Sequence, residues 1–205
     1  MMAVQTETHK GYKIEILPDE NAENPREFES NLGVMVCFHN RHNLGDKHDH
    51  KASEFSGWKE LENHLRDEHD ARVVLPLFLY DHSGLRMKVG SFQGLLPQGH
   101  AEFDSGQVGF IYATRDAIIG AFGRPKLTAV TLDKARKSLE IEVKVYDQWL
   151  SGDVYGYTVA KPSKCESCGN EEDEEVESCW GFYGAEETMA EAKRVVDALA
   201  GKKGA

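Results

Sequence analysis

The fold of this chain turns on the stretch TLDKARKSLEIEVKVYDQWL, residues 131–150. Apolar residues recur in it every three or four positions, at Leu132, Ala135, Leu139, Val143, Tyr146 and Leu150. This spacing predicts a long amphipathic helix, and Thr131 can cap its first turn. A helix with one apolar face needs another layer of structure to cover that face.

Strand patterns lie on both sides of this helix. Residues 154–160 and 176–183 predict a hairpin around an acidic loop. Alternating or continuous apolar runs of strand length also occupy four earlier segments, 11–17, 33–38, 72–80 and 107–112. Pro76 cannot donate to a ladder, so it predicts an edge position or a bulge in its strand. Residues 84–106 are rich in glycine and lack periodicity, and we expect them to be irregular.

Three shorter helices are predicted over residues 56–70, 115–122 and 185–200. The order of elements lacks the strict strand and helix alternation of a doubly wound sheet. It predicts an α+β fold, with one mixed or antiparallel sheet of about five to six strands and helices packed mainly on one side. We expect a single domain over residues 11–200, with an acidic hairpin loop at 161–175. Residues 1–10 and 201–205 are expected to be flexible tails.

The charge, hydropathy and cysteine content exclude several classes of protein. In 205 residues, 24 Lys and Arg face 35 Asp and Glu, which gives a formal charge of −11. This balance disfavours a broad electrostatic hold on nucleic-acid phosphates and favours a basic protein partner. No apolar run approaches the roughly 18 to 20 residues of a membrane span, and residues 1–10 lack the apolar block of a signal peptide. Four cysteines are too few for a disulfide scaffold, so we expect a cytoplasmic protein.

Polar residues stand at the ends of three predicted strands. His39 follows one strand, Asp81 and His82 follow another, and Asp104 precedes a third. If the last two strands pair antiparallel, Asp81, His82 and Asp104 converge. Histidine with carboxylates can bind a divalent metal or transfer protons near neutral pH, so these four are candidate catalytic residues. The alternative is a turn in which Asp81 caps backbone donors and Gly84 supplies a positive φ.

A second polar group lies in the loop after residue 38. His42, Asp46, His48 and His50 resemble a metal-binding tract loosely, because no predicted helix places two of them on one face. The sequence favours a solvated loop over a metal site for these residues.

The cysteines offer a partial zinc pattern. Cys165 and Cys168, with Cys179 further along, have half the spacing of a zinc knuckle, and the local sequence lacks a fourth ligand. Cys179 also reads as a small buried thiol in its strand, and the other two as an exposed pair without a role. Zinc or another divalent metal therefore stays an alternative to a chain without a cofactor.

The densest negative patch is the run Glu171, Glu172, Asp173, Glu174 and Glu175. It could imitate nucleic-acid phosphates or meet a basic groove, although most acidic runs of this kind are solvated loops. The chain lacks a Gly-rich phosphate loop, a dinucleotide fingerprint, a Gly-x-Ser-x-Gly elbow and a His-Glu-x-x-His helix. Their absence argues against the familiar nucleotide-using and hydrolase scaffolds.

Several phrases of the sequence are distinctive: NLGVMVCFH (31–39), LYDHSG (79–84), DSGQVGFIY (104–112), DVYG (153–156) and SCWGFYG (178–184). Together they resemble a family of small acidic proteins of bacteriophages and other mobile elements, over residues 11–199. The resemblance implies a phage or plasmid gene expressed in a bacterial cytoplasm, and it carries over no activity or site residue. Residues 165–175 look like an addition to the family pattern, which weakens the zinc interpretation.

Two functional hypotheses follow. The first is an accessory protein that presents acidic surface to a basic groove of a host nucleic-acid-processing or defence complex, as anti-restriction and anti-CRISPR proteins do. The second is a small metal-assisted enzyme that acts on a nucleotide or nucleic acid through His39, Asp81, His82 and Asp104. The first needs a host partner and no catalytic residue. The second needs the polar cluster to converge in a cleft.

Overall fold

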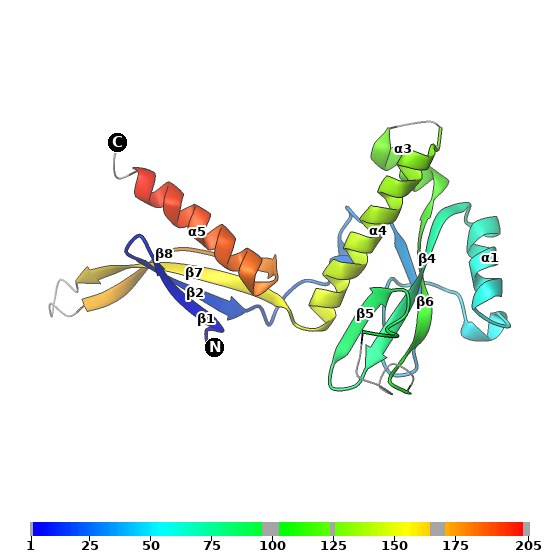
Figure 1. Cartoon of the computed structure of the whole chain (residues 1–205), viewed down its shortest axis with the longest axis horizontal. Coiled ribbons are helices and arrows are strands. Elements are labelled where there is room, and N and C mark those ends of the chain that lie inside the picture. Colours follow the sequence, from blue (N-terminus) through cyan, green and yellow to red (C-terminus); the bar gives the residue numbers. More distant parts are fainter. Residues whose placement is uncertain (1, 96–102, 124–125, 165–170, 203–205) are drawn as a thin grey trace. The chain divides into compact units, whose positions relative to one another are not determined.

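The computed structural model describes residues 2–95, 103–123, 126–164 and 171–202 (Figure 1). It confirms the α+β class, with strands in two antiparallel sheets of four strands each. Its contacts divide the chain into two compact units. The terminal unit is Met1–Glu23 with Gly152–Ala205, and the central unit is Asn24–Ser151. We expected one sheet in one domain, because an apolar pattern identifies strands without assigning them to partners.

The terminal unit contains β1 (Gln5–His9), β2 (Tyr12–Pro18), β7 (Val154–Lys164), β8 (Glu171–Tyr183) and α5 (Ala185–Lys202). Its strand order is β1-β2-β7-β8, so β2 from the start of the chain pairs with β7 from near its end. The helix α5 packs on one face of this sheet. The shared core consists of alternate strand residues and one stripe of the helix: Tyr12, Ile14, Ile16, Tyr157, Val159, Met189, Ala192 and Val196.

Two expectations for this unit need correction. Residues 1–10 are not wholly a tail, because Gln5–His9 forms β1 and pairs with β2 through a tight turn at Lys10 and Gly11. Both turn residues have positive φ, 47° and 78°, as a two-residue hairpin turn requires. The region 161–175 is also more regular than a loop, since β7 reaches Lys164 and β8 starts at Glu171.

The central unit contains β3 (Val34–Cys37), β4 (Ala71–Asp81), β5 (Leu85–Val89) and β6 (Ser105–Thr114), in the order β3-β6-β4-β5. Its helices are α1 (Trp58–Glu68), α3 (Arg115–Phe122) and α4 (Ala129–Leu150), with short 3₁₀ turns at Pro25–Glu27 and Ala52–Glu54. Figure 1 shows α4 and α1 on opposite sides of this sheet. The expected packing on mainly one side therefore does not hold in this unit.

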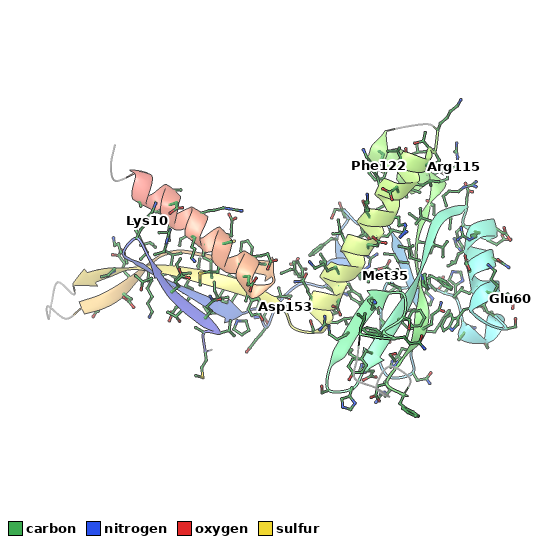
Figure 2. All side chains as sticks on the ribbon, viewed as in Figure 1. Lys10, Met35, Glu60, Arg115, Phe122 and Asp153 are labelled. Atoms are coloured by element: carbon green, nitrogen blue, oxygen red, sulfur yellow. The ribbon has the colours of Figure 1, made fainter. Side chains whose placement is uncertain are left out.

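Alternation along the strands explains why both faces are covered. On β3, Met35 belongs to the core under α4, where Figure 2 labels it, and the next residue, Val36, belongs to the core under α1. On β6, Ile111 faces α4 while Phe110 and Tyr112 face α1. A sheet buried on both faces has nearly continuous apolar strands, and this is the pattern that marked these strands in the sequence.

Close approach between strands fixes one glycine of β6. A Cβ atom at Gly109 would collide with the carbonyl oxygen of Val36 on β3. Pro76 lies on β4, an interior strand, and not at an edge as one alternative required. The other alternative is confirmed, since the ladder between β4 and β6 is irregular at Leu77 and Phe78. Proline is tolerated there because the pairing of β4 with β5 begins only at Leu77.

A buried ion-pair network centred on Arg26 joins the loops of the central unit to α4. The Arg26 side chain is only 3% exposed, and its guanidinium donates to Asp46 at 2.8 and 2.9 Å and to Glu142 at 2.8 Å. It also donates to the carbonyl oxygen of Gly33 at 2.7 Å. Asp46 accepts from the amide of Met35 at 2.8 Å, and so one cation holds the start of β3 and the following loop against the long helix.

Two acidic residues of α4, Glu142 and Asp147, accept hydrogen bonds from backbone amides at the two edge strands of the sheet. Glu142 accepts from the amides of Leu32 and Gly33, just before β3, at 2.7 and 3.3 Å. One turn later, Asp147 accepts from the amide of Met87 on β5 at 2.7 Å. None of the helices in the described ranges combines the length and apolar content that a membrane span requires.

Replacing Arg26 by methionine should lower the free energy of unfolding by about 3 to 5 kcal/mol, because it leaves two buried carboxylates without their counter-ion. Urea unfolding followed by circular dichroism measures the loss. The control is Arg136→Met, which removes an exposed pair with Glu140 and should cost less than about 0.5 kcal/mol. Equal losses for the two variants would contradict the role given to Arg26.

Candidate functional site

The expected polar residues gather at one edge of the central unit's sheet. The strand β3 ends at Cys37, β4 ends at Asp81 and β6 begins at Ser105. Because β4 and β6 are antiparallel, their ends are adjacent, and the amide of Asp81 donates to the carbonyl oxygen of Asp104 at 2.9 Å. The pairing expected from the sequence is therefore present, and it brings His39, Asp81, His82 and Asp104 to this edge.

Asp81 is the hub of the first half of this edge site. Its Oδ2 lies 3.8 Å from His39 Nε2 and 3.7 Å from His42 Nε2, and it also accepts from the guanidinium of Arg41. Its side chain is 18% exposed, against 39% for His42 and 69% for Arg41. A mostly covered carboxylate thus holds three side chains that can carry positive charge, and two of them reach solvent.

Backbone amides fix the tautomer of the neutral His39 ring. Its Nδ1 accepts from the amides of Arg41 and His42, at 3.4 and 3.2 Å. In the neutral ring the proton is therefore on Nε2, the atom that faces Asp81. Burial lowers the pKa of His39, as do the neighbouring His42 and Arg41, while Asp81 raises it. The ring also stacks on His42, with centroids 5.2 Å apart, which orders the tight loop after β3.

Asp104 and His82 form the second half of the edge site. His82 Nδ1 lies 3.3 Å from Asp104 Oδ2, and the imidazole stacks on Tyr80 with centroids 6.1 Å apart. The His82 side chain is 52% exposed and that of Asp104 is 30% exposed. The arrangement repeats that of His42 and Asp81, with an accessible imidazole backed by a more covered carboxylate.

A cleft of about 560 Å³ runs along this edge, and it is lined by His39, Arg41, Asp81, Phe103, Asp104 and Ser105 among others. A second hollow, of about 780 Å³, shares residues 38–40 with this cleft and is also lined by His42. Cys37 lines the second hollow, and burial raises the pKa of its thiol to about 12, so it is not poised as a nucleophile.

The four loop residues considered as metal ligands, His42, Asp46, His48 and His50, contact different partners. Asp46 is bonded to Arg26, and the His48 ring nitrogen Nε2 lies 3.1 Å from the carbonyl oxygen of Cys37. His42 faces Asp81, and His50 faces two histidines of another segment. These four residues therefore do not form one site.

The cysteines and the acidic run lie in the terminal unit. Cys165 and Cys168 are outside the described residues. Cys179 is an exposed free thiol on β8, and so the expected buried role is wrong. Residues 171–175 begin β8, where Asp173 pairs with Lys13 at 3.1 Å and Glu174 with Lys161 at 3.0 Å. The side chains of residues 172–175 are exposed.

Among the described residues, two groups have donor atoms close enough to hold a metal ion: His39, His42 and Asp81, and His50, His64 and His69. The first group does not fit one well. His39 would have to lose the proton that its backbone contacts place on Nε2, and the Arg41 guanidinium already occupies the carboxylate. The second group contains only imidazoles.

Comparisons with protein-family models, with curated proteins and with solved structures find no match to this chain.

Sequence reasoning missed several of these residues. The sequence predicts no role for Arg41, and it favours a solvated loop for His42. A signal existed in the run His39-Asn-Arg-His42, which puts three cationic or titratable side chains directly after a buried strand. The sequence also predicts no role for His64 and His69. The helical pattern around them is explained by Leu61 and Leu65, which are buried.

His39→Asn tests the backbone contacts of this loop, since asparagine can accept the same amides without titrating. Because the pKa of His39 is lowered on folding, the unfolded chain binds its proton more tightly. Stability should therefore fall as the pH drops through 6.5, the ordinary histidine value, toward the lower folded value. We expect the variant's stability relative to wild type to improve between about pH 7.5 and pH 5. Urea titrations at each pH measure this, and a difference that does not change with pH would refute it.

Proposed function

We propose that the edge site of the central unit cleaves a phosphate ester of a nucleotide or nucleic acid by general acid and base catalysis. The observation that carries the proposal is the pair of adjacent carboxylates, Asp81 and Asp104, each of which backs a solvent-accessible imidazole. A carboxylate behind an imidazole orients the ring and stabilises its protonated form. Imidazoles exchange protons readily near neutral pH.

The proposed roles follow from exposure. His42 and His82 are the proton-transfer groups, and Asp81 and Asp104 orient them. One imidazole takes a proton from the attacking water or hydroxyl as the new phosphorus–oxygen bond forms. The other gives its proton to the leaving oxygen as the old bond breaks, so that protons balance over the step. His39 is a positioning residue, because both of its ring nitrogens face groups of the protein.

The substrate class is supported by the side chains beside Asp81 and Asp104 in the cleft. Arg41, which is mostly in solvent beside the cleft, can pair with a phosphate. Phe103 lines the same cleft and is 87% exposed, and an exposed aromatic ring can stack on a base. The central unit has 18 Asp and Glu against 16 Lys and Arg, a formal charge of only −2, so it repels a polyanion weakly.

His42→Gln and His82→Gln should each lower the cleavage rate by about 10² to 10⁴, the usual contribution of general acid or base catalysis. The purified protein is tested against single-stranded RNA, single-stranded DNA and nucleoside monophosphates, with and without EDTA. His9→Gln is the matched control, since His9 is paired with Asp197 in the terminal unit and should have no effect. The proposal fails if wild-type protein cleaves none of these substrates, or if both site variants keep the full rate.

A second candidate function is supported by the charge of the terminal unit. This unit has 17 Asp and Glu against 8 Lys and Arg, which gives −9 of the total −11. With the phage-like phrases of the sequence, this supports an accessory protein that binds a basic groove of a host defence or nucleic-acid complex in the bacterial cytoplasm.

The triple variant Glu172→Gln, Glu175→Gln, Glu177→Gln tests this second candidate. It should weaken capture of host nucleases or restriction complexes at low salt by about tenfold or more, and high salt should abolish capture by wild type. The charge-matched control is Asp116→Asn with Asp133→Asn and Glu140→Gln, which removes three exposed carboxylates of the central unit and should bind normally. Capture that is unchanged in the triple variant would rule out the acidic strand as the binding surface.

A further inference from the structure

Three histidines of the central unit surround one point. His50 lies in the segment before the 3₁₀ turn Ala52–Glu54, His64 lies on α1, and His69 ends that helix. Their ring centroids are 5.2, 5.4 and 5.5 Å apart, with interplanar angles of 86°, 85° and 73°. Each ring offers a nitrogen that lies within 4.8 Å of the other two.

The local backbone explains how His64 and His69 come together. Five residues apart, they would point in different directions on a continuous helix. The helix stops at Glu68, however, and His69 has φ −104° and ψ 5°. Asp70 then adopts a positive φ of 49°, an uncommon conformation for a residue other than glycine, and β4 begins at Ala71. The chain end of α1 is thus turned sharply at the residue next to His69.

The surroundings of the three rings are aromatic. Phe55 packs against His64 with centroids 5.3 Å apart and against His50 at 6.2 Å, and Tyr112 lies 5.8 Å from His69. Within the described ranges, none of the three imidazoles has a hydrogen bond or ion pair with a protein group. Imidazole nitrogens that face one another without a protein partner are open to a ligand that binds between them.

We propose that His50, His64 and His69 bind one divalent transition-metal ion, with zinc as the best-fitting ion. Neutral imidazole is a preferred zinc ligand, and three ring nitrogens within 4.8 Å of one another are close enough to bind the same ion. The aromatic walls keep competing acceptors away and hold the rings in place. A set of three histidines leaves the fourth position for water or a small anionic ligand.

This site goes beyond the proposed function, since none of its residues lines the cleft of the edge site. Its first consequence is structural. A bound ion would fasten the segment around His50 to both the middle and the end of α1. The same segment also contacts α1 through Ser56, which donates to Glu60 at 2.6 Å, and through Phe55, whose ring centroid lies 5.3 Å from that of His64.

The test is zinc binding by the full chain. Protein stripped with a chelator and dialysed should rebind one zinc ion per chain, with a rise in melting temperature. His50→Gln, His64→Gln and His69→Gln should each weaken zinc binding more than about 100-fold, beyond the effect of losing an outer-shell partner. His42→Gln and His82→Gln are matched controls at the edge site and should bind zinc as wild type does. A stoichiometry near zero, or equal loss in the controls, would overturn the proposal.

X-ray absorption on the zinc-loaded wild type keeps the test decisive if a variant does not fold. The expected spectrum has three imidazole ligands and one oxygen ligand, with cobalt giving the visible absorption of a tetrahedral site. Sulfur scattering would assign the ion to the cysteines instead, and fewer than three imidazoles would also overturn the site. Neither readout depends on catalysis, so failure here is distinguishable from failure of the proposed enzyme.

Discussion

The central unit depends on the burial of one guanidinium group. Arg26 stands before β3 in a segment with little regular structure, yet its charge is shared by Asp46, Glu142 and the Gly33 carbonyl. A buried charge of this kind is tolerated only when its partners are fixed, and fixing them places β3 and the loop that follows. The edge site inherits its geometry from this constraint, because His39 and His42 belong to that loop. Asp147 accepts from a backbone amide of β5, as Glu142 accepts from the amides just before β3, and so it fixes the opposite edge of the sheet.

Much of the secondary structure could be predicted from hydrophobic rhythm. The long helix appears as α4, with its buried stripe at Ala135, Leu139, Val143 and Tyr146, although Thr128 and not Thr131 caps it. The strand β5 was missed because it is short and lies in a glycine-rich stretch, and β1 was missed because it is polar. The division into two sheets was also out of reach. Pairing between β2 and β7 is decided by contacts across most of the chain, which local periodicity does not encode.

Some of the candidate site residues could likewise be predicted from the sequence, and others could not. Asp81, His82 and Asp104 could be expected together because antiparallel pairing follows from strand order and fixes which ends meet. The three-histidine group could not, since it depends on how α1 terminates. A positive φ at Asp70 is a backbone detail without a strong sequence signal, whereas at glycine it would have been anticipated. Side chains that such a turn brings together can be predicted as a site only when the turn itself is known.

The terminal unit is assembled from the two ends of the polypeptide, and this has a consequence for its synthesis. The strands β1 and β2 are translated before the central unit, but their partner β7 is translated only after it. Since chains grow at about 5 to 20 residues per second, the early hairpin waits several seconds with an unpaired edge. That waiting edge belongs to β2, in which Lys13 and Glu15 alternate with the apolar residues, and charged side chains on an open edge disfavour pairing with neighbouring chains.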